Sequence, residues 1–201
     1  VFLFLDLHYT CLLHYFEGPC LRVELNAQSI LLQAIAEQEY PHDTMMMGST
    51  NLRRASWVNS YAQALSIPIS FVREKPKPDH LKFISEADGI VGNVKGYRVL
   101  IYDDILRSGS TLINAAKCYL NAGATSVVGI VSHLACYSEQ QIVDLINSDI
   151  EKIICTNSHP ITQIPLVKEN DKFVVVDTSA LFTQCLFEIL PTPENKHRSS
   201  I

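Results

Sequence analysis

Residues Val99–Leu112 constrain the fold more strongly than any other part of the 201-residue chain. Four apolar or aromatic residues, Val99–Tyr102, run directly into two adjacent acids, Asp103 and Asp104. A short loop of serines and glycine follows, and a segment with helical apolar spacing begins at Thr111. This order predicts a buried parallel strand with an acidic end, then a hydroxyl-rich loop, then the N-terminus of a helix.

The predicted loop has the chemistry of an anion site. Backbone N–H groups and the positive dipole end at the start of a helix attract phosphate. The carboxylates of Asp103 and Asp104 can accept hydrogen bonds from sugar hydroxyls, directly or through a bound Mg²⁺. The stretch therefore suits a phosphorylated sugar. The structural alternative is that the acids only cap a turn and the serines only cap a helix.

Strand-like and helix-like segments alternate along the rest of the chain. The strand-like segments are nearly continuous β-branched runs, which are typical of a parallel sheet covered on both faces. We therefore expect an α/β fold with a three-layer, doubly wound parallel sheet, in which ligands bind at the carboxyl ends of the strands near a topological switch. Strands are expected at 1–6, 44–48, 67–72, 81–84, 99–102, 126–132, 150–156 and 173–176, and helices at 27–38, 52–65, 111–121, 139–146 and 179–190.

Composition narrows the class of protein. The formal net charge of -5 at pH 7 argues against a nucleic-acid partner, because no basic field is present to bind phosphates. The longest apolar runs are too short to span a membrane, and Val1–Leu5 lacks the basic flank and cleavage site of a signal peptide. The six cysteines form no CxxC pair, which predicts reduced thiols in a cytoplasmic protein. The chain lacks an initiator Met, so we expect it to begin inside a longer protein.

The segment Y-D-D-I-L-R-S-G-S-T at 102–111 resembles the PRPP loop of type I phosphoribosyltransferase-fold proteins. Further segments narrow the resemblance to the ribose-phosphate pyrophosphokinases, the PRPP synthetases. These segments are Leu5–His8 with Tyr15-Phe16, Ser49–Asn51, Asn93–Gly96, Gly123-Ala124, Ser132-His133 and Thr156–Ser158. The resemblance implies three parts: residues 1–25 as the end of a first domain, 26–176 as a phosphoribosyltransferase-like domain, and 177–201 as a helix and polar tail that pack back on the first domain.

The resemblance also implies a reaction. PRPP synthetases transfer diphosphate from ATP to ribose 5-phosphate with Mg²⁺, giving PRPP and AMP, and they build their active sites between subunits. The chain is therefore expected to be a ribose-phosphate diphosphokinase that binds ATP, ribose 5-phosphate and Mg²⁺ and forms a homo-oligomer.

Individual residues take their expected roles from the same resemblance. His8 matches a histidine that reaches ATP and a metal ion, and Asn51 stands where the family has a metal-binding aspartate. Arg73 and Lys75 are the candidates for the cations that clamp the transferring phosphates. The ribose 5-phosphate site is expected to consist of Asp103, Asp104, Arg107, Ser108, Gly109, Ser110 and Thr111.

Four positions depart from the family pattern. Asn51 replaces an acid and predicts weaker metal binding, because an amide offers one neutral oxygen. Glu74 and Pro76 occupy the places of the family's Lys-x-Arg pair, and Arg107 occupies that of an aspartate. These departures keep open the alternative of a non-catalytic homologue that binds ribose 5-phosphate, PRPP or nucleotide and regulates an active partner. A base phosphoribosyltransferase, which shares the loop but consumes PRPP, is a second alternative.

Overall fold

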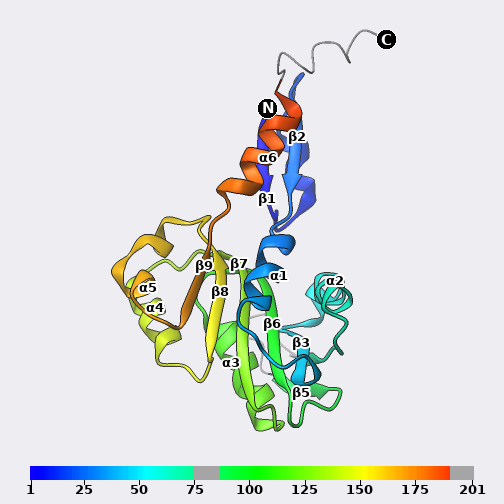
Figure 1. The fold of residues 1–201 in the computed structure, drawn as a ribbon, viewed down its shortest axis with the longest axis vertical. Coiled ribbons are helices and arrows are strands. Elements are labelled where there is room, and N and C mark those ends of the chain that lie inside the picture. Colours follow the sequence, from blue (N-terminus) through cyan, green and yellow to red (C-terminus); the bar gives the residue numbers. More distant parts are fainter. Residues whose placement is uncertain (75–86, 191–201) are drawn as a thin grey trace, which may run out of the picture. The chain divides into compact units, whose positions relative to one another are not determined.

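The computed structural model describes residues 1–74 and 87–190 (Figure 1). The described chain forms two compact units. One consists of Val1–Ala27 with the described part of 177–201, and the other contains the described residues of Gln28–Val176. Among the described helices, none combines the length and the apolar character that crossing a bilayer requires.

The larger unit is built on a five-stranded parallel sheet (Figure 1). Its strands lie in the order β3 (Met45–Ser49), β6 (Arg98–Leu106), β7 (Ser126–Leu134), β8 (Lys152–Thr156) and β9 (Phe173–Val176). Every neighbouring pair is parallel. The central strands are almost fully buried, which explains why they read as continuous apolar runs in the sequence.

The winding of the chain reverses between β3 and β6. After β3 the chain forms α2 (Ala55–Leu65) and returns on the outer side of β3, where Ile69 makes a parallel bridge to Met47. It then continues into β4 (Phe71–Glu74) and β5 (Ala87–Val91), an antiparallel pair, before β6 enters on the opposite side of β3. This reversal is the topological switch of a doubly wound sheet, where ligands bind at the carboxyl ends of the strands.

Helices cover both faces of the sheet. Alternate residues of β6 separate into two sets, because successive side chains of a strand point to opposite faces. Val99 and Ile101 share a core with α3 (Ser110–Asn121) and α4 (Glu139–Ile146). On the other face, Tyr102 packs against Tyr61 and Trp57 of α2. Together with α1 (Gln28–Ala36), which contacts β8 and β9, this arrangement confirms the three-layer α/β fold expected from the sequence.

A buried tyrosine fixes the carboxyl end of β3. The hydroxyl of Tyr119, from α3, accepts the Ser49 N–H at 3.2 Å and lies 3.2 Å from the Ser49 and Ser70 carbonyl oxygens. Gly48 makes room for it, since a Cβ at this position would lie 2.9 Å from that hydroxyl. The Ser49–Asn51 segment, which leads out of β3, therefore starts from a rigid position.

The smaller unit contains β1 (Phe2–Leu5), which pairs in parallel with β2 (Arg22–Leu25), and α6 (Ser179–Ile189). Between the two strands lies a 3-10 helix, Thr10–Tyr15. After β1, Asp6 adopts φ 41°, and its carboxylate accepts the N–H of Ala27 at 3.2 Å. The larger unit also contains the short elements η2 (His42–Thr44), η3 (Leu52–Arg54), η4 (Pro160–Gln163) and α5 (Pro165–Lys168).

Several boundaries differ from the sequence prediction. The strand expected to end at Tyr102 continues through the acids to Leu106, because β7 pairs with it as far as Leu134. The helix expected from Leu52 begins with a 3-10 turn, η3 (Leu52–Arg54), before α2. Strands β2 and β5 were not predicted, and the strand expected at 81–84 lies outside the described residues.

Candidate functional site

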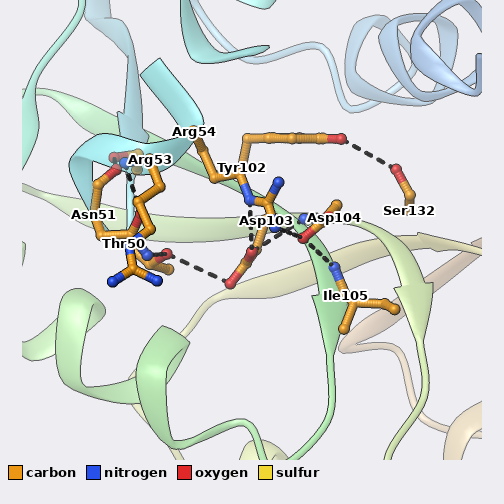
Figure 2. Close-up of polar contacts among 10 residues, drawn as sticks. Thr50, Asn51, Arg53, Arg54, Tyr102, Asp103, Asp104, Ile105 and Ser132 are labelled. Atoms are coloured by element: carbon orange, nitrogen blue, oxygen red, sulfur yellow. Dashed lines mark hydrogen bonds and ion pairs between the residues drawn. The ribbon is translucent and has the colours of Figure 1, made fainter. Parts of the chain in front are cut away.

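The acid pair lies at the topological switch of the sheet. Ser49 pairs in register with Tyr102, so the next residues along the two strands, Thr50 and Asp103, are neighbours at the carboxyl edge. The Thr50 hydroxyl donates to Asp103 Oδ2 at 3.4 Å (Figure 2). Asp103 also accepts the Asp104 N–H at 3.1 Å, and Asp104 accepts the Ile105 N–H at 2.9 Å. These contacts orient both carboxylates, two from within β6 and one from the segment after β3.

Arg54 contacts both acids, and the sequence reasoning did not include it among the candidate site residues. Its Nη2 lies 2.8 Å from Asp104 Oδ1, and its Nε lies 4.0 Å from Asp103 Oδ1 (Figure 2). The side chains are mostly buried, with exposed fractions of 15% for Arg54, 16% for Asp103 and 5% for Asp104. The sequence does contain an Arg53-Arg54 pair just after the strand expected at 44–48. If that strand is the neighbour of the strand at 99–102, these arginines lie close to the acids at its end.

Burial and charge make the acid pair electrostatically unusual. Burial and the neighbouring Asp104 carboxylate raise the pKa of Asp103 to about 7, while the Arg54 guanidinium opposes this rise. The pair therefore binds a proton in the neutral range, and its negative charge is partly balanced by an internal cation. Such an arrangement suits hydrogen bonding to uncharged hydroxyl groups.

The predicted loop follows β6 and leads into α3. Gly109 adopts φ 77°, in the left-handed region that favours glycine, and serves as the N-cap of α3. Ser108, Ser110 and Thr111 are exposed, and the hydroxyls of Ser108 and Ser110 lie 2.8 Å apart. The three hydroxyls thus lie at the start of this twelve-residue helix, beside its first backbone N–H groups, as the sequence predicted.

The other basic candidates are placed differently. The guanidinium of Arg107 lies 4.8 Å from the ring centre of the exposed Tyr137, a cation–π contact. Arg73 is exposed on β4, in register with Gly89 of β5. Lys75 and Pro76 lie outside the described residues, and for Glu74 only the backbone is described.

The two expected metal ligands fall in different units. Asn51 is the N-cap of η3, where its side-chain oxygen accepts the Arg53 N–H at 2.9 Å. His8 is an exposed residue of the smaller unit, with its ring edge-on to Tyr9 at 4.4 Å. Within residues 1–74 and 87–190, no three His, Cys, Asp or Glu side chains form a group that could hold a metal ion. With Asn51 capping a turn and Arg54 on the acids, the residues at the switch do not fit a divalent metal.

Comparison with known proteins identifies relatives along most of the chain. The family model described as the phosphoribosyl synthetase-associated domain matches residues 37–193. A ribose-phosphate pyrophosphokinase of Clostridium acetobutylicum is 26% identical over 186 residues, which cover 92% of this chain and 55% of the relative. Ribose-phosphate pyrophosphokinase 1 of Listeria innocua is 30% identical over 188 residues, with the same coverage. The chain thus spans about half the length of the curated relatives it matches.

One solved structure has the same fold. The crystal structure of phosphoribosylpyrophosphate synthetase from Mycobacterium smegmatis superimposes with a TM-score of 0.75 at 24% sequence identity. The match covers 93% of this chain and 57% of the other. It supports the α/β fold class.

Proposed function

The chain belongs to the phosphoribosyl synthetase-associated family, and from this premise we propose that it binds ribose 5-phosphate at the β6–α3 loop. One observation carries the proposal: a single strand, loop and helix supply both the acids and the anion-binding groups. The Asp103 and Asp104 carboxylates suit the ribose hydroxyls, and the Ser108–Thr111 helix start suits the 5-phosphate. The site lies at the topological switch, where doubly wound sheets bind ligands.

The reaction that we propose for the whole site follows the names of the relatives, which are ribose-phosphate pyrophosphokinases. The anomeric hydroxyl of ribose 5-phosphate attacks the β-phosphorus of ATP. The bond from that phosphorus to the oxygen shared with the α-phosphate breaks, AMP leaves with the electron pair, and the hydroxyl proton is released. A Mg²⁺ ion that arrived with ATP would neutralise part of the charge of its phosphates. Arg73 and His8 are the described candidates for contacts to ATP.

A second function is favoured by the contact between Arg54 and Asp104. An internal cation on the acid pair and an asparagine engaged as a helix cap are features of a site that binds its ligand without turning it over. In this case the chain would bind ribose 5-phosphate, PRPP or a nucleotide and regulate a catalytically active partner. The two functions share the ligand site and differ in whether AMP is formed.

Calorimetric titration of the purified protein with ribose 5-phosphate tests the shared part of the proposal. We expect saturable binding that is at least about tenfold weaker for unphosphorylated ribose and for the double variant Ser110→Ala/Thr111→Val, because both lose phosphate contacts. Thr125→Val is the matched control, since Thr125 is an exposed threonine beyond the other end of α3. Equal affinity for ribose and ribose 5-phosphate would refute the site.

Formation of AMP from ATP and ribose 5-phosphate separates the two functions. The diphosphokinase requires AMP that appears in step with PRPP and disappears in Asp104→Asn. Saturable binding of ribose 5-phosphate without AMP identifies the non-catalytic binder. Co-purification of the chain with an active pyrophosphokinase then provides a positive test of the regulatory role.

A further inference from the structure

Arg54 is the cation that contacts the acid pair from the turn after β3. It is the last residue of η3 and directly precedes α2, so its side chain leaves the backbone near the carboxyl end of β3. From there it reaches across to β6 and contacts both carboxylates, at 2.8 Å for Asp104 and 4.0 Å for Asp103 (Figure 2). The Arg54 side chain is 15% exposed and the Asp104 side chain is 5% exposed, so this charge pair is largely shielded from water.

The carboxylate oxygens are already engaged by groups of this chain. Asp104 Oδ1 accepts from both the Arg54 guanidinium and the Ile105 N–H. Asp103 Oδ1 accepts the Asp104 N–H, and Asp103 Oδ2 accepts the Thr50 hydroxyl. At least three of the four oxygens of the pair therefore have donors before any ligand arrives.

A divalent ion does not suit these surroundings. Mg²⁺ requires oxygen ligands at about 2.0–2.1 Å in near-octahedral geometry. An ion bound to Asp104 Oδ1 would lie beside the guanidinium that is 2.8 Å from the same oxygen, and the two cations would repel each other at a buried position. The nearby Asn51 contributes a neutral oxygen that is already committed to the Arg53 N–H.

We propose that Arg54 is the resident cation of the acid pair, so that this chain binds ribose 5-phosphate at the β6–α3 loop without a divalent ion on Asp103 or Asp104. This inference rests on the proposed function for its ligand. It assigns Arg54 a positioning role: the guanidinium orients the carboxylates so that they can receive sugar hydroxyls. A Mg²⁺ ion that enters with ATP is bound by the phosphates and leaves this assignment unchanged.

Manganese binding tests the inference directly, with the EPR signal of free Mn²⁺ as the readout. We expect the wild-type chain and Arg53→Gln to show no Mn²⁺ site that depends on Asp104. Arg54→Gln should gain such a site, with an affinity at least about tenfold higher than any Mn²⁺ binding that the wild-type chain shows, because the acids lose their internal cation. Adding Asp104→Asn to Arg54→Gln should abolish this gain. Arg53 is the matched control because it is the exposed neighbour in the same 3-10 turn.

Two results would overturn the inference. In the first, the wild-type chain binds Mn²⁺ as tightly as Arg54→Gln does, and this binding disappears in Asp104→Asn. In the second, Arg54→Gln folds but gains no Mn²⁺ site. If Arg54→Gln does not fold, the wild-type chain still decides the question through its affinity for ribose 5-phosphate in excess Mg²⁺ and in EDTA. We expect equal affinities, and a tenfold loss in EDTA would refute a resident arginine cation.

These measurements also separate this inference from the proposed function. If the chain binds no ribose 5-phosphate but a Mn²⁺ site appears only in Arg54→Gln, the proposed ligand is contradicted and the role of Arg54 is supported. If binding of ribose 5-phosphate requires a divalent ion on the acids, the proposed ligand is supported and the role of Arg54 is contradicted.

Discussion

Replacing Asp103 by asparagine should stabilise the protein at alkaline pH. Burial and the Asp104 carboxylate raise the pKa of Asp103 from 3.8 to about 7, so the folded chain keeps a proton that the unfolded chain has already lost. Stability therefore falls as pH rises through this window. The slope is about 1.4 kcal/mol per pH unit, and the complete window costs up to about 4 kcal/mol. The penalty is absent below about pH 4 and fully present above about pH 7.

Asparagine removes the titration, and its Nδ2 takes the place of Oδ2, where the Thr50 hydroxyl can accept instead of donate. Its side-chain oxygen can still accept the Asp104 N–H, which Asp103 Oδ1 accepts at 3.1 Å. Urea unfolding of wild type and Asp103→Asn at a series of pH values measures the difference in free energy of unfolding. We expect the variant to be more stable by about 2–4 kcal/mol at pH 8, and the advantage to shrink steadily toward pH 4.

The control for this series is Asp171→Asn, which changes an exposed aspartate in a turn and should give no such pH-dependent gain. An Asp103→Asn variant that is less stable than wild type at pH 8 would contradict the reasoning. That outcome would mean that Asp103 stays ionised through the neutral range and that its attraction to Arg54 outweighs burial and the repulsion from Asp104.

Three further predictions follow from buried contacts. Tyr119→Phe should lower the free energy of unfolding by about 1–3 kcal/mol in urea titrations, because the buried Ser49 N–H loses its acceptor. Gly109→Ala should lower the free energy of unfolding by about 1–2 kcal/mol and weaken ribose 5-phosphate binding in calorimetry. The reason is that φ of residue 109 is 77° and the new Cβ would lie 3.0 Å from Leu145. Burial raises the pKa of Cys155 to about 12, so mass spectrometry should find this thiol labelled by a disulfide reagent only after unfolding.

The sequence was sufficient for the parts of the site that are local in the chain. Val99–Tyr102 reads as a buried strand because both faces of β6 are covered, and Ser110 begins α3 where small residues give way to helical apolar spacing. The helix at Glu139–Ile146 was predicted to the residue, and in the structure Ser138 and Gln141 form a capping box at its start. In each case the residues that carry the sequence pattern lie within or next to the element that the pattern predicts.

Contacts between distant segments could not be predicted in the same way. The extension of β6 to Leu106 depends on β7, which pairs with it as far as Leu134, and a strand end with two acids gives no sign of such a partner. The role of Arg54 depends on a 3-10 turn that delays α2 by three residues and turns this side chain toward residues about fifty positions away in the sequence. Helical periodicity alone places Leu52–Arg54 on a regular helix, where the direction of the arginine is different.

The doubly wound topology explains why one residue can determine the character of the acid pair. At the switch, the helix that follows β3 starts beside the carboxyl end of β6, so the first residues after β3 face the acids of the neighbouring strand. Asn51 is used as a helix cap there, and Arg54 neutralises Asp104. Arg107, on the other side of the acids along the chain, is held over Tyr137. Under the proposed function, a sugar phosphate that binds at the β6–α3 loop would meet acids already partly balanced by an arginine, and the cost of bringing phosphate near two carboxylates would be reduced without a metal.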